Sequence, residues 1–436
     1  MTQKDALKIM NAGYNVLLTG AAGSGKTYLL NRFIAQAKER GLGVAITAST
    51  GIAATHLGGR TIHSWAGIGI KESLTKKDLQ KISKRSYLKK QFEGTDILII
   101  DEISMLSAEH LDMVNLVCQS LKKNTLAFGG LQIILSGDFF QLQPIAAAES
   151  KARFVYYSQV WPEMDLRVCY LEEQHRQNDA DLDFVLNALR EAQADCKVKE
   201  ILGQRLIKEE NSQATALRLY THNLDVDRIN HLELAKIKDE EEKYYMIGSG
   251  QEKLVAALKK NCLAPEVLTL KRGARVMFVK NKFKESKTIY VNGQSGVVVS
   301  FDENRWPVVR CSNGDLITVT PEAWTIDDEE QHILAQISQI PLRLAWAITV
   351  HKSQGMTLES ATIDLSRAFA CGMAYVALSR LRSLEGLFLL GISESAYQVD
   401  QEVLAYDKEL KKLSAIAKNM KIKFSGRRQD ALFKIC

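Results

Sequence analysis

The chain has 436 residues, enough for two or three domains with separate hydrophobic cores. Its 46% hydrophobic and 25% charged residues are ordinary for a globular protein, and no run of about eighteen apolar residues predicts a membrane span. The net charge of +6 permits a polyanionic partner without indicating one. Seven cysteines without a C-x-x-C pair argue against a disulfide framework, so we expect a reducing, cytoplasmic compartment.

The first third of the chain alternates short apolar runs with helix-like segments. The runs at 14–19, 43–48, 96–100 and 131–136 are apolar on both faces, as buried parallel strands are. The pattern predicts an α/β domain built on a parallel sheet. A lysine-rich stretch within 65–92 interrupts the pattern and predicts a short helical insertion.

A glycine-rich motif follows the first predicted strand. The sequence GAAGSGKT at 20–27 fits G-x-x-x-x-G-K-[ST] and opens a predicted helix, which is the context that makes this motif credible. Backbone N–H groups around such glycines close on phosphate oxygens, and the helix N-terminus adds favourable partial charge. We expect Lys26 to reach the phosphates and Thr27 to hold Mg²⁺, with Gly23, Ser24 and Gly25 completing the cradle. The alternative is a glycine-rich turn without a ligand.

Polar residues follow two further predicted strands. Asp101 and Glu102 end the run DILII, where a carboxylate faces the same edge as the phosphate loop. Asp101 suits the Mg²⁺ shell, and Glu102 suits a general base that orients the attacking water. Gln141 lies in GDFFQLQP at 137–144, and we expect it to sense the γ-phosphate. The alternative, when Gln141 is read alone, is a plain turn that carries a glutamine.

A second, discontinuous α/β region begins near Arg167. Runs at 216–221, 361–364 and 386–390 are its predicted strands. Between them, short strands recur about every ten residues and are separated by turn signals such as Asn292-Gly293. This texture predicts a small inserted antiparallel barrel, SH3-like or OB-like.

Several blocks, in this order, resemble those of superfamily 1 DNA helicases of the petite-integration-frequency (Pif-type) family, in the RecD-like branch. They are GAAGSGKT at 20–27, TASTGIAA at 47–54, GGRTIHS at 58–64, DEISM at 101–105, GDFFQLQP at 137–144, LEEQHRQ at 171–177, LRLAWAITVHKSQGMTL at 342–358 and VALSRLRSLEGL at 376–387. These blocks span most of the chain, and three of them (DEISM, GDFFQLQP and TVHKSQGMTL) are specific to this branch.

The resemblance implies an α/β fold of two RecA-like P-loop motor domains with parallel sheets and an SH3-like barrel inserted in the second. The expected first domain is 1–165, with a short wedge at about 65–92; the second is 166–225 with 340–405; the accessory insertion is 226–339; and a helix with a basic tail occupies 406–436. ATP and Mg²⁺ are the implied cofactors.

The same resemblance assigns further nucleotide contacts. Arg176 and Arg380 match two arginine fingers, whose cationic planar groups stabilise the charge of the phosphoryl transition state. Without the motif match, each would be taken for a surface arginine in a salt bridge. Gln354 and Gly355 match the block that contacts nucleotide and DNA. Gln3 either matches the adenine-reading glutamine or is an ordinary N-terminal residue. His175 stands where many relatives carry Phe, which leaves the packing around Arg176 open.

Two sets of residues match blocks that hold the DNA backbone, and hydroxyls, N–H groups, His and Lys suit phosphate contacts without base reading. The first-domain set is Thr50, Gly51, His63 and Ser64, next to which Trp65 is a further DNA-binding candidate. The second-domain set is Thr349, His351, Lys352 and Ser353, with Thr221 and Asn223 as further backbone candidates. His63 and His351 are alternatively structural histidines, and Trp65 either stacks on a base or fills the core. The lysine-rich stretches 71–90 and 418–429 are expected to be solvated faces.

We therefore expect an ATP-dependent DNA helicase that moves 5′ to 3′ on single-stranded DNA and unwinds duplex DNA, with G-quadruplex DNA as a further substrate that the family suggests. Its partners are single-stranded DNA and single-strand/duplex junctions, without a membrane, and we expect a cytoplasmic monomer, nucleoid-associated if bacterial. Roles in DNA repair, recombination and telomere maintenance come from the same resemblance. The alternatives are an ATP-switched nucleic-acid-binding protein, a motor subunit of a recombination complex, and an RNA helicase.

Overall fold

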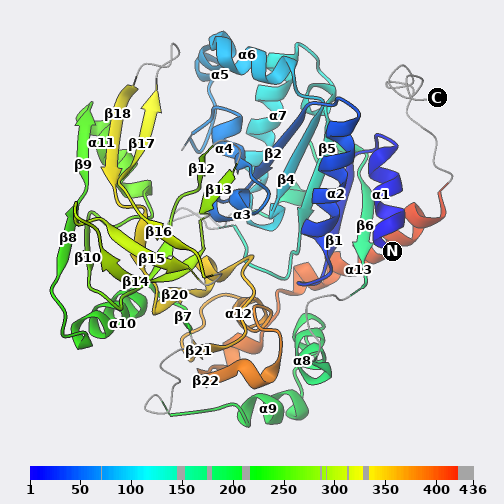
Figure 1. The fold of residues 1–436 in the computed structure, drawn as a ribbon. Coiled ribbons are helices and arrows are strands. Elements are labelled where there is room, and N and C mark those ends of the chain that lie inside the picture. The colour runs from blue at the N-terminus through cyan, green and yellow to red at the C-terminus, as the bar shows by residue number, and fades with distance from the viewer. Residues whose placement is uncertain are drawn as a thin grey trace. The chain divides into compact units, whose positions relative to one another are not determined.

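The computed structural model describes residues 1–69, 71–144, 153–173, 179–208, 217–284, 287–290, 292–311, 314–327 and 333–420 (Figure 1). The chain divides into two compact units. Unit 1 comprises Met1–Ile207, Thr357–Ser360 and Leu365–Cys436, and unit 2 comprises Lys208–Met356 and Ala361–Asp364. These units differ from the domain boundaries expected from the sequence, which stay predictions.

Unit 1 is built on a six-stranded sheet of order β3-β2-β4-β5-β1-β6. Every neighbouring pair in it is parallel, which confirms the predicted α/β class with a parallel sheet. The strands are β1 (Val16–Gly20), β2 (Val44–Ala48), β3 (Arg60–Thr61), β4 (Ile97–Asp101), β5 (Gln132–Gly137) and β6 (Arg167–Leu171). The expected first-domain boundary at 165 falls before β6. The sequence did not assign β6 to this sheet, because its apolar run carries no sign of which sheet it joins.

Helices cover both faces of this sheet. The connection from β1 to β2 through α2 (Lys26–Glu39) runs along the sheet in one direction, and the connection from β4 to β5 through α7 (Ala108–Lys122) runs in the other. Right-handed crossovers in opposite directions place their helices on opposite faces. Figure 1 shows this arrangement, with α1 (Gln3–Asn11) beside α2.

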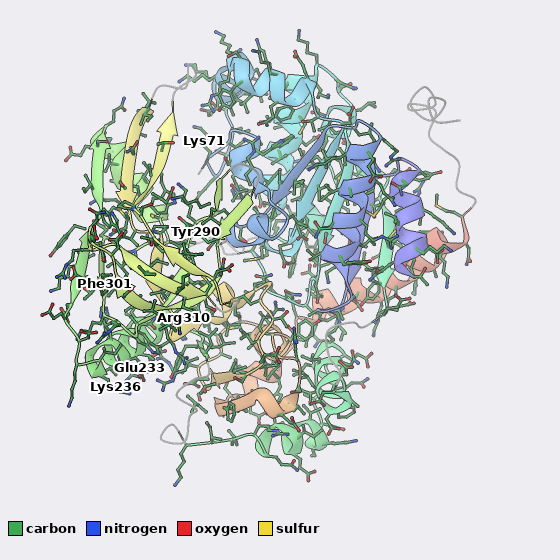
Figure 2. All side chains as sticks on the ribbon, in the orientation of Figure 1. Lys71, Glu233, Lys236, Tyr290, Phe301 and Arg310 are labelled. Carbon is green, nitrogen blue, oxygen red and sulfur yellow. The ribbon has the colours of Figure 1, made fainter. Side chains whose placement is uncertain are left out.

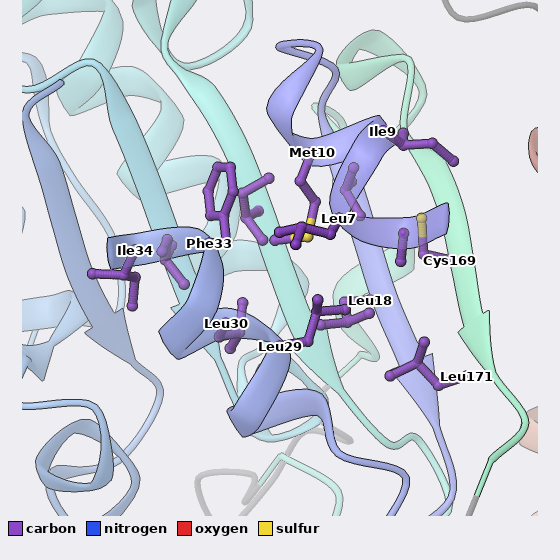
Figure 3. Packing of buried hydrophobic residues seen from close by; sticks show 14 of the residues in the cluster. Leu7, Ile9, Met10, Leu18, Leu29, Leu30, Phe33, Ile34, Cys169 and Leu171 are labelled. Carbon is purple, nitrogen blue, oxygen red and sulfur yellow. The ribbon is translucent and has the colours of Figure 1, made fainter. Parts of the chain in front are cut away.

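The core on the α1–α2 face is close-packed and apolar. Phe33 and Leu29 of α2 and Met10 of α1 are almost fully buried against Leu18 of β1 and Leu171 of β6 (Figure 3). Strand β1 is therefore buried on both faces, as a central parallel strand should be. The packing fixes the end of β1, from which the glycine-rich loop leaves.

The remaining elements of unit 1 include the predicted helical insertion. Within it, α5 begins with a capping box in which Thr75 and Asp78 bond each other's backbone N–H groups. The elements are α3 (Gly51–His56), α4 (Ile62–Trp65), α5 (Lys76–Lys84), α6 (Ser86–Glu93), α8 (Ala180–Arg190), α9 (Cys196–Gly203), α12 (Met373–Leu378), β22 (Leu387–Ile392) and α13 (Gln401–Asn419).

Unit 2 contains parallel strands in the order β20-β7-β21, with β7 (Leu217–Tyr220) between β20 (Ala347–Thr349) and β21 (Ala361–Leu365). Helix α10 (Asn223–Lys236) packs against β20 and β7. Glu233 and Lys236, both labelled in Figure 2, form an ion pair on α10, and Glu233 also pairs with Arg218 of β7.

The rest of unit 2 is antiparallel. A five-stranded sheet has the order β16-β15-β14-β11-β19, and smaller sheets have the orders β17-β18-β9, β10-β8 and β12-β13. Phe301 and Arg310 mark β14 and β15 in Figure 2. The elements are β8 (Glu242–Tyr245), β9 (Ile247–Gly250), α11 (Glu252–Asn261), β10 (Val267–Leu270), β11 (Arg275–Phe278), β12 (Lys282–Lys284), β13 (Lys287–Tyr290), β14 (Ser295–Phe301), β15 (Pro307–Cys311), β16 (Leu316–Thr318), β17 (Glu322–Asp327), β18 (Ile333–Gln339) and β19 (Leu342–Leu344).

The short strands expected in this insertion, from the runs at 274–281, 290–302, 306–312 and 315–321, correspond to β11, β14, β15 and β16. Gly293 has the positive φ, 88°, that its turn requires. The finer expectation of an SH3-like barrel stays a prediction. Within the described residues, no helix is both long and apolar enough to cross a membrane.

The core packing predicts that Phe33→Ala lowers the free energy of unfolding by about 3–5 kcal/mol, because the ring is fully buried and leaves a cavity. Urea denaturation followed by circular dichroism measures this. Tyr28→Ala on the same helix is the matched control, since Tyr28 is 60% exposed, and we expect a change of about 0.5 kcal/mol or less beyond helix propensity. Equal losses in the two variants would contradict the assigned core.

Candidate active site

The glycine-rich loop takes a backbone shape that only glycine adopts easily. Gly20, Gly23 and Gly25 have φ values of 145°, 86° and 82°. A Cβ at Gly20 would lie 2.5 Å from the carbonyl oxygen of Leu171 in β6. Gly25 is the N-cap of α2, so the first N–H groups of this helix face the loop, which is a favourable place for an anion.

Lys26 and Ser24 place polar groups in this loop. Lys26 Nζ donates to the carbonyl oxygens of Gly20 at 2.9 Å and Ala21 at 3.0 Å. Burial lowers the pKa of Lys26, although nearby carboxylates partly oppose this. The Ser24 hydroxyl is buried and has no hydrogen-bond partner among the described residues. A buried hydroxyl without a partner fits a loop that receives a phosphate oxygen.

The end of β4 places two carboxylates beside the loop. Asp101 is the last residue of β4 and is largely buried. Glu102 follows with φ 51° and ψ 44°, a left-handed conformation that costs energy for a residue with a side chain and is frequent at active sites. Burial and the charge of Asp101 raise the pKa of Glu102 to about 7, although Lys26 and Arg380 oppose the rise.

The loop after β5 adds Asp138 and Gln141, both buried. Gln141 Nε2 donates to Asp138 Oδ2 at 3.4 Å. Asp138 Oδ1 accepts from Arg190 Nη1 at 2.7 Å. Burial alone would raise the pKa of Asp138, but the charges of Arg190 and Lys26 hold it below its usual value. Asp138 is therefore a charged, paired carboxylate.

Arg380 is 2% exposed and lies just after α12. Its Nε donates to the Val376 carbonyl oxygen at 2.9 Å, and its Nη2 donates to the Ser379 hydroxyl at 2.8 Å. The positive charge of Arg380 lowers the pKa of Glu102, so Arg380 belongs to the same site. The second expected finger, Arg176, lies outside the described residues, as does His175.

The remaining predicted residues of the nucleotide site lie in different units. Gln3 lies beside the loop, where its amide nitrogen is 3.5 Å from the Ser24 carbonyl oxygen, and Thr27 is exposed at the start of α2. Gln354 and Gly355 belong to unit 2, where Gln354 is buried and Gly355 has φ 80°.

The expected DNA contacts in unit 1 differ in exposure. Thr50 Oγ1 accepts from the Ala53 N–H at the start of α3, and the neighbouring Gly51 is exposed. Ser64 is also exposed. Burial, together with His110, whose ring centroid is 4.8 Å away, lowers the pKa of His63 to about 4, so His63 is neutral at pH 7.

Trp65 is 2% exposed, and its ring centroid lies 4.3 Å from that of Phe92. Its carbonyl oxygen accepts from the Gln91 amide at 2.9 Å. This position favours the alternative that Trp65 is a core residue over the expectation that it stacks on a base. The reason is that α4 turns its indole inward onto α6, which the sequence around HSW does not reveal.

In unit 2, the expected DNA contacts gather after β20. Thr349 Oγ1 accepts from the Lys352 N–H at 3.4 Å, and the Ser353 hydroxyl donates to the Val350 carbonyl at 2.7 Å, so both shape the turn. Burial lowers the pKa of His351. Burial and Arg343 lower the pKa of Lys352 to about 8.

After β7, Thr221 is buried within hydrogen-bonding distance of His222, and Asn223 is exposed at the start of α10.

Two residues of the site were missed by sequence reasoning. Arg190 is buried on the apolar face of α8, next to Leu186 and Leu189, and Tyr375 is buried in α12. The only signal for Arg190 is a charged residue at a core position of the helical repeat. For Tyr375 there is none, because a tyrosine in a buried helix usually only fills space.

The loop geometry predicts that Gly20→Ala weakens nucleotide binding by about tenfold or more, because the added Cβ meets the Leu171 carbonyl and the backbone strain costs about 1–3 kcal/mol. Titration with a fluorescent ATP analogue measures this. The matched control is Gly203→Ala, at the end of α9, where a Cβ meets nothing within 4 Å. Unchanged affinity in Gly20→Ala would contradict the described loop.

Comparisons with known proteins show the family. The family model "PIF1-like helicase" matches residues 3–193. The ATP-dependent DNA helicase Pif1 of Psychrobacter sp. is 41% identical over 95% of this chain and 71% of its own length. Several animal relatives are longer, and the chain spans 62% to 65% of their length.

Two solved structures that resemble this chain are also Pif1 helicases. Pif1 helicase from Candida albicans has a TM-score of 0.85 and 32% identity, over 94% of this chain and 98% of that one. Pif1 helicase from Bacteroides, in complex with ADP-AlF3 and ssDNA, has a TM-score of 0.77 and 29% identity, with the same coverage of both chains. The blocks named above, the parallel-sheet site and these similarities agree, and the chain belongs to the PIF1-like helicase family.

Proposed function

We propose that this chain is an ATP-dependent DNA helicase that moves 5′ to 3′ along single-stranded DNA and separates duplex strands. Family membership and the named relatives establish the ATP-dependent DNA helicase; the direction rests on the family resemblance alone. The observation that carries the proposal is the meeting of Lys26, Asp101, Glu102, Gln141 and Arg380 in unit 1.

In the proposed nucleotide site, Lys26 and the N–H groups of Gly23, Ser24 and Gly25 hold the phosphates. The Bacteroides Pif1 complex with ADP-AlF3 supports a nucleotide as the ligand. Thr27 and Asp101 offer a hydroxyl and a carboxylate, which are oxygen ligands of the kind that Mg²⁺ prefers. A bound Mg²⁺ would supply positive charge next to the phosphate oxygens.

The proposed hydrolysis uses groups of this chain around those phosphates. Glu102, with its raised pKa, accepts a proton from the attacking water. Gln141, whose amide is anchored on Asp138, orients that water or senses the γ-phosphate. Arg380 stabilises the charge that develops on the transferred phosphoryl group. Arg176 stays proposed as a second finger, and Gln3 and Gln354 with Gly355 as nucleotide contacts.

The proposed DNA contacts are a set in each unit, and both suit backbone phosphates. In unit 1 they are Thr50, Gly51, Ser64 and the neutral imidazole of His63. In unit 2 they are Thr221, Asn223, Thr349, His351, Lys352 and Ser353. The Bacteroides Pif1 complex with ssDNA supports single-stranded DNA as the ligand. The resemblance also supports proposals on partners and role. The proposed further ligands are single-strand/duplex junctions and G-quadruplex DNA. The other proposals are a monomeric state, a cytoplasmic or nucleoid location, and roles in repair, recombination and telomere maintenance.

The site predicts ATP turnover that single-stranded DNA stimulates strongly. Lys26→Ala and Glu102→Gln should each lower DNA-stimulated turnover by about a hundredfold or more. Glu102→Gln should keep ATP affinity, because it removes the base and leaves the phosphate loop intact. Steady-state phosphate release and nucleotide titration measure the two quantities. The matched control is Glu109→Gln, an exposed change at the start of α7.

Unwinding is tested on duplexes that carry a 5′ or a 3′ single-stranded tail. Strand separation from the 5′ tail alone is the expected result. Unwinding from the 3′ tail alone would refute the direction, and ATP-gated DNA binding without strand separation would instead support an ATP switch. Full unwinding by Lys26→Ala would refute the assigned motor site.

The proposed Lys352 contact predicts that affinity for single-stranded DNA falls as pH rises through about 8. The reason is that Lys352, with its pKa lowered to about 8, carries its charge below that pH and loses it above. Fluorescence anisotropy across this range measures the effect. Lys352→Arg should flatten the profile, because the guanidinium stays charged. Lys352→Met should lower the slope of log affinity against log salt by about 0.7. Identical pH profiles for wild type and Lys352→Arg would contradict the contact.

A further inference from the structure

Unit 1 contains a buried polar cluster around Arg190. Arg190 Nη1 donates to Asp138 Oδ1 at 2.7 Å and to the Tyr375 hydroxyl at 3.1 Å. Its Nη2 donates to the Tyr170 hydroxyl at 2.8 Å and lies 3.4 Å from Asp407 Oδ1. All five residues are at most 7% exposed. Such a buried ion pair is retained only if its hydrogen bonds are satisfied.

Tyr375 connects this cluster to the phosphate loop. Its hydroxyl donates to Asp138 Oδ2 at 2.9 Å and accepts from the backbone N–H of Ala22 at 2.8 Å. With the bond from Arg190, the one donor and both acceptor positions of the hydroxyl are used. Its position is therefore set from three directions, one of which is the backbone between Gly20 and Gly23.

The helix of Tyr375 also holds Arg380. Every residue of α12 is buried, and the helix ends immediately before Ser379. Arg380 bonds the Val376 carbonyl and the Ser379 hydroxyl, so its guanidinium is attached to the last turn of the same helix. Ala22, Tyr375 and Arg380 are thus connected through α12, from the phosphate loop to the Arg380 guanidinium.

We propose that Tyr375 is a positioning residue for ATP hydrolysis, whose hydroxyl sets the place of Arg380 by attaching α12 to the backbone N–H of Ala22. The inference rests on the proposed function, in which Arg380 stabilises the transition state. Small misplacements of such a group have large effects on rate, because the gain depends on where charge develops. Substrate binding needs this alignment much less, since Lys26 and the loop hold the phosphates.

Tyr170 is a control of the same kind in the same cluster. Its hydroxyl accepts from Arg190 and donates to Asp407 at 2.8 Å, and its side chain is as buried as that of Tyr375. It does not bond the phosphate loop or α12 in the described structure. Tyr170→Phe and Tyr375→Phe each remove one hydroxyl that accepts from Arg190 and donates to a buried carboxylate, Asp407 or Asp138, so a cluster that only stabilises the fold predicts the same result for both.

The experiment compares the two variants in the full chain. Tyr375→Phe should lower kcat of the DNA-stimulated ATPase by about tenfold or more, with KM for ATP changed by about twofold or less. Tyr170→Phe should keep kcat within about twofold. The thermal midpoints of the two variants should fall by comparable amounts. Equal kcat values in Tyr170→Phe and Tyr375→Phe would overturn the proposal.

A double-mutant cycle with Arg380→Lys gives the second readout. If Tyr375 acts through Arg380, adding Tyr375→Phe to Arg380→Lys should change kcat by about twofold or less, whereas independent effects would multiply. Multiplied effects would overturn the proposal. If Tyr375→Phe does not fold, 4-aminophenylalanine at position 375 supplies a weaker hydrogen-bonding group; a lowered kcat supports the proposal and an unchanged kcat overturns it.

These outcomes differ from failure of the proposed function. If the wild-type chain showed no DNA-stimulated ATP turnover and no unwinding, the function itself would be refuted and the inference with it. An active wild type with Tyr375→Phe equal to Tyr170→Phe would refute the inference alone.

Discussion

The site depends on one constraint, the adjacent parallel alignment of β4, β5 and β1. Parallel neighbours end at the same edge of a sheet, so the loop after each of these strands begins there. The glycine-rich loop, the pair Asp101–Glu102 and the GDFFQ segment therefore meet although they lie far apart in the chain. Antiparallel order would separate them by the length of a strand, and no choice of side chains would then restore the site.

The second requirement is electrostatic, because the carboxylates of Asp101, Glu102 and Asp138 come together in the interior of unit 1. Arg190 and Tyr375 bind Asp138 and keep it charged and fixed, so this carboxylate anchors Gln141. For Glu102, burial and the charge of Asp101 instead raise the pKa to about 7. Chemically identical groups thus differ with their surroundings: Asp138 is held in its charged form, whereas the raised pKa of Glu102 suits the general base proposed above.

Much of the fold could be predicted from the sequence, because buried parallel strands and the glycine-rich motif leave strong local patterns. The runs that became β1, β2, β4 and β5 were placed within two residues of their observed ends. Partners in space leave no such pattern, and the apolar run of β6 therefore gave no sign that this strand pairs with β1. Trp65 shows the same limit, since an exposed stacking residue and a core residue look alike in the segment HSW until α6 is placed beside it. Arg190 and Tyr375 were missed for this reason too.

The placement of α12 follows from contacts at both of its ends and its middle. A Cβ at Gly372, the N-cap, would lie 2.4 Å from the Phe140 carbonyl oxygen, so only glycine allows the helix to begin against the GDFFQ segment. The carbonyl oxygen of Arg380 accepts from the Leu358 N–H beyond the other end. Tyr375 bonds the phosphate loop between them. A six-residue helix is too short to be stable by itself, so these contacts determine where it lies and which way Arg380 points.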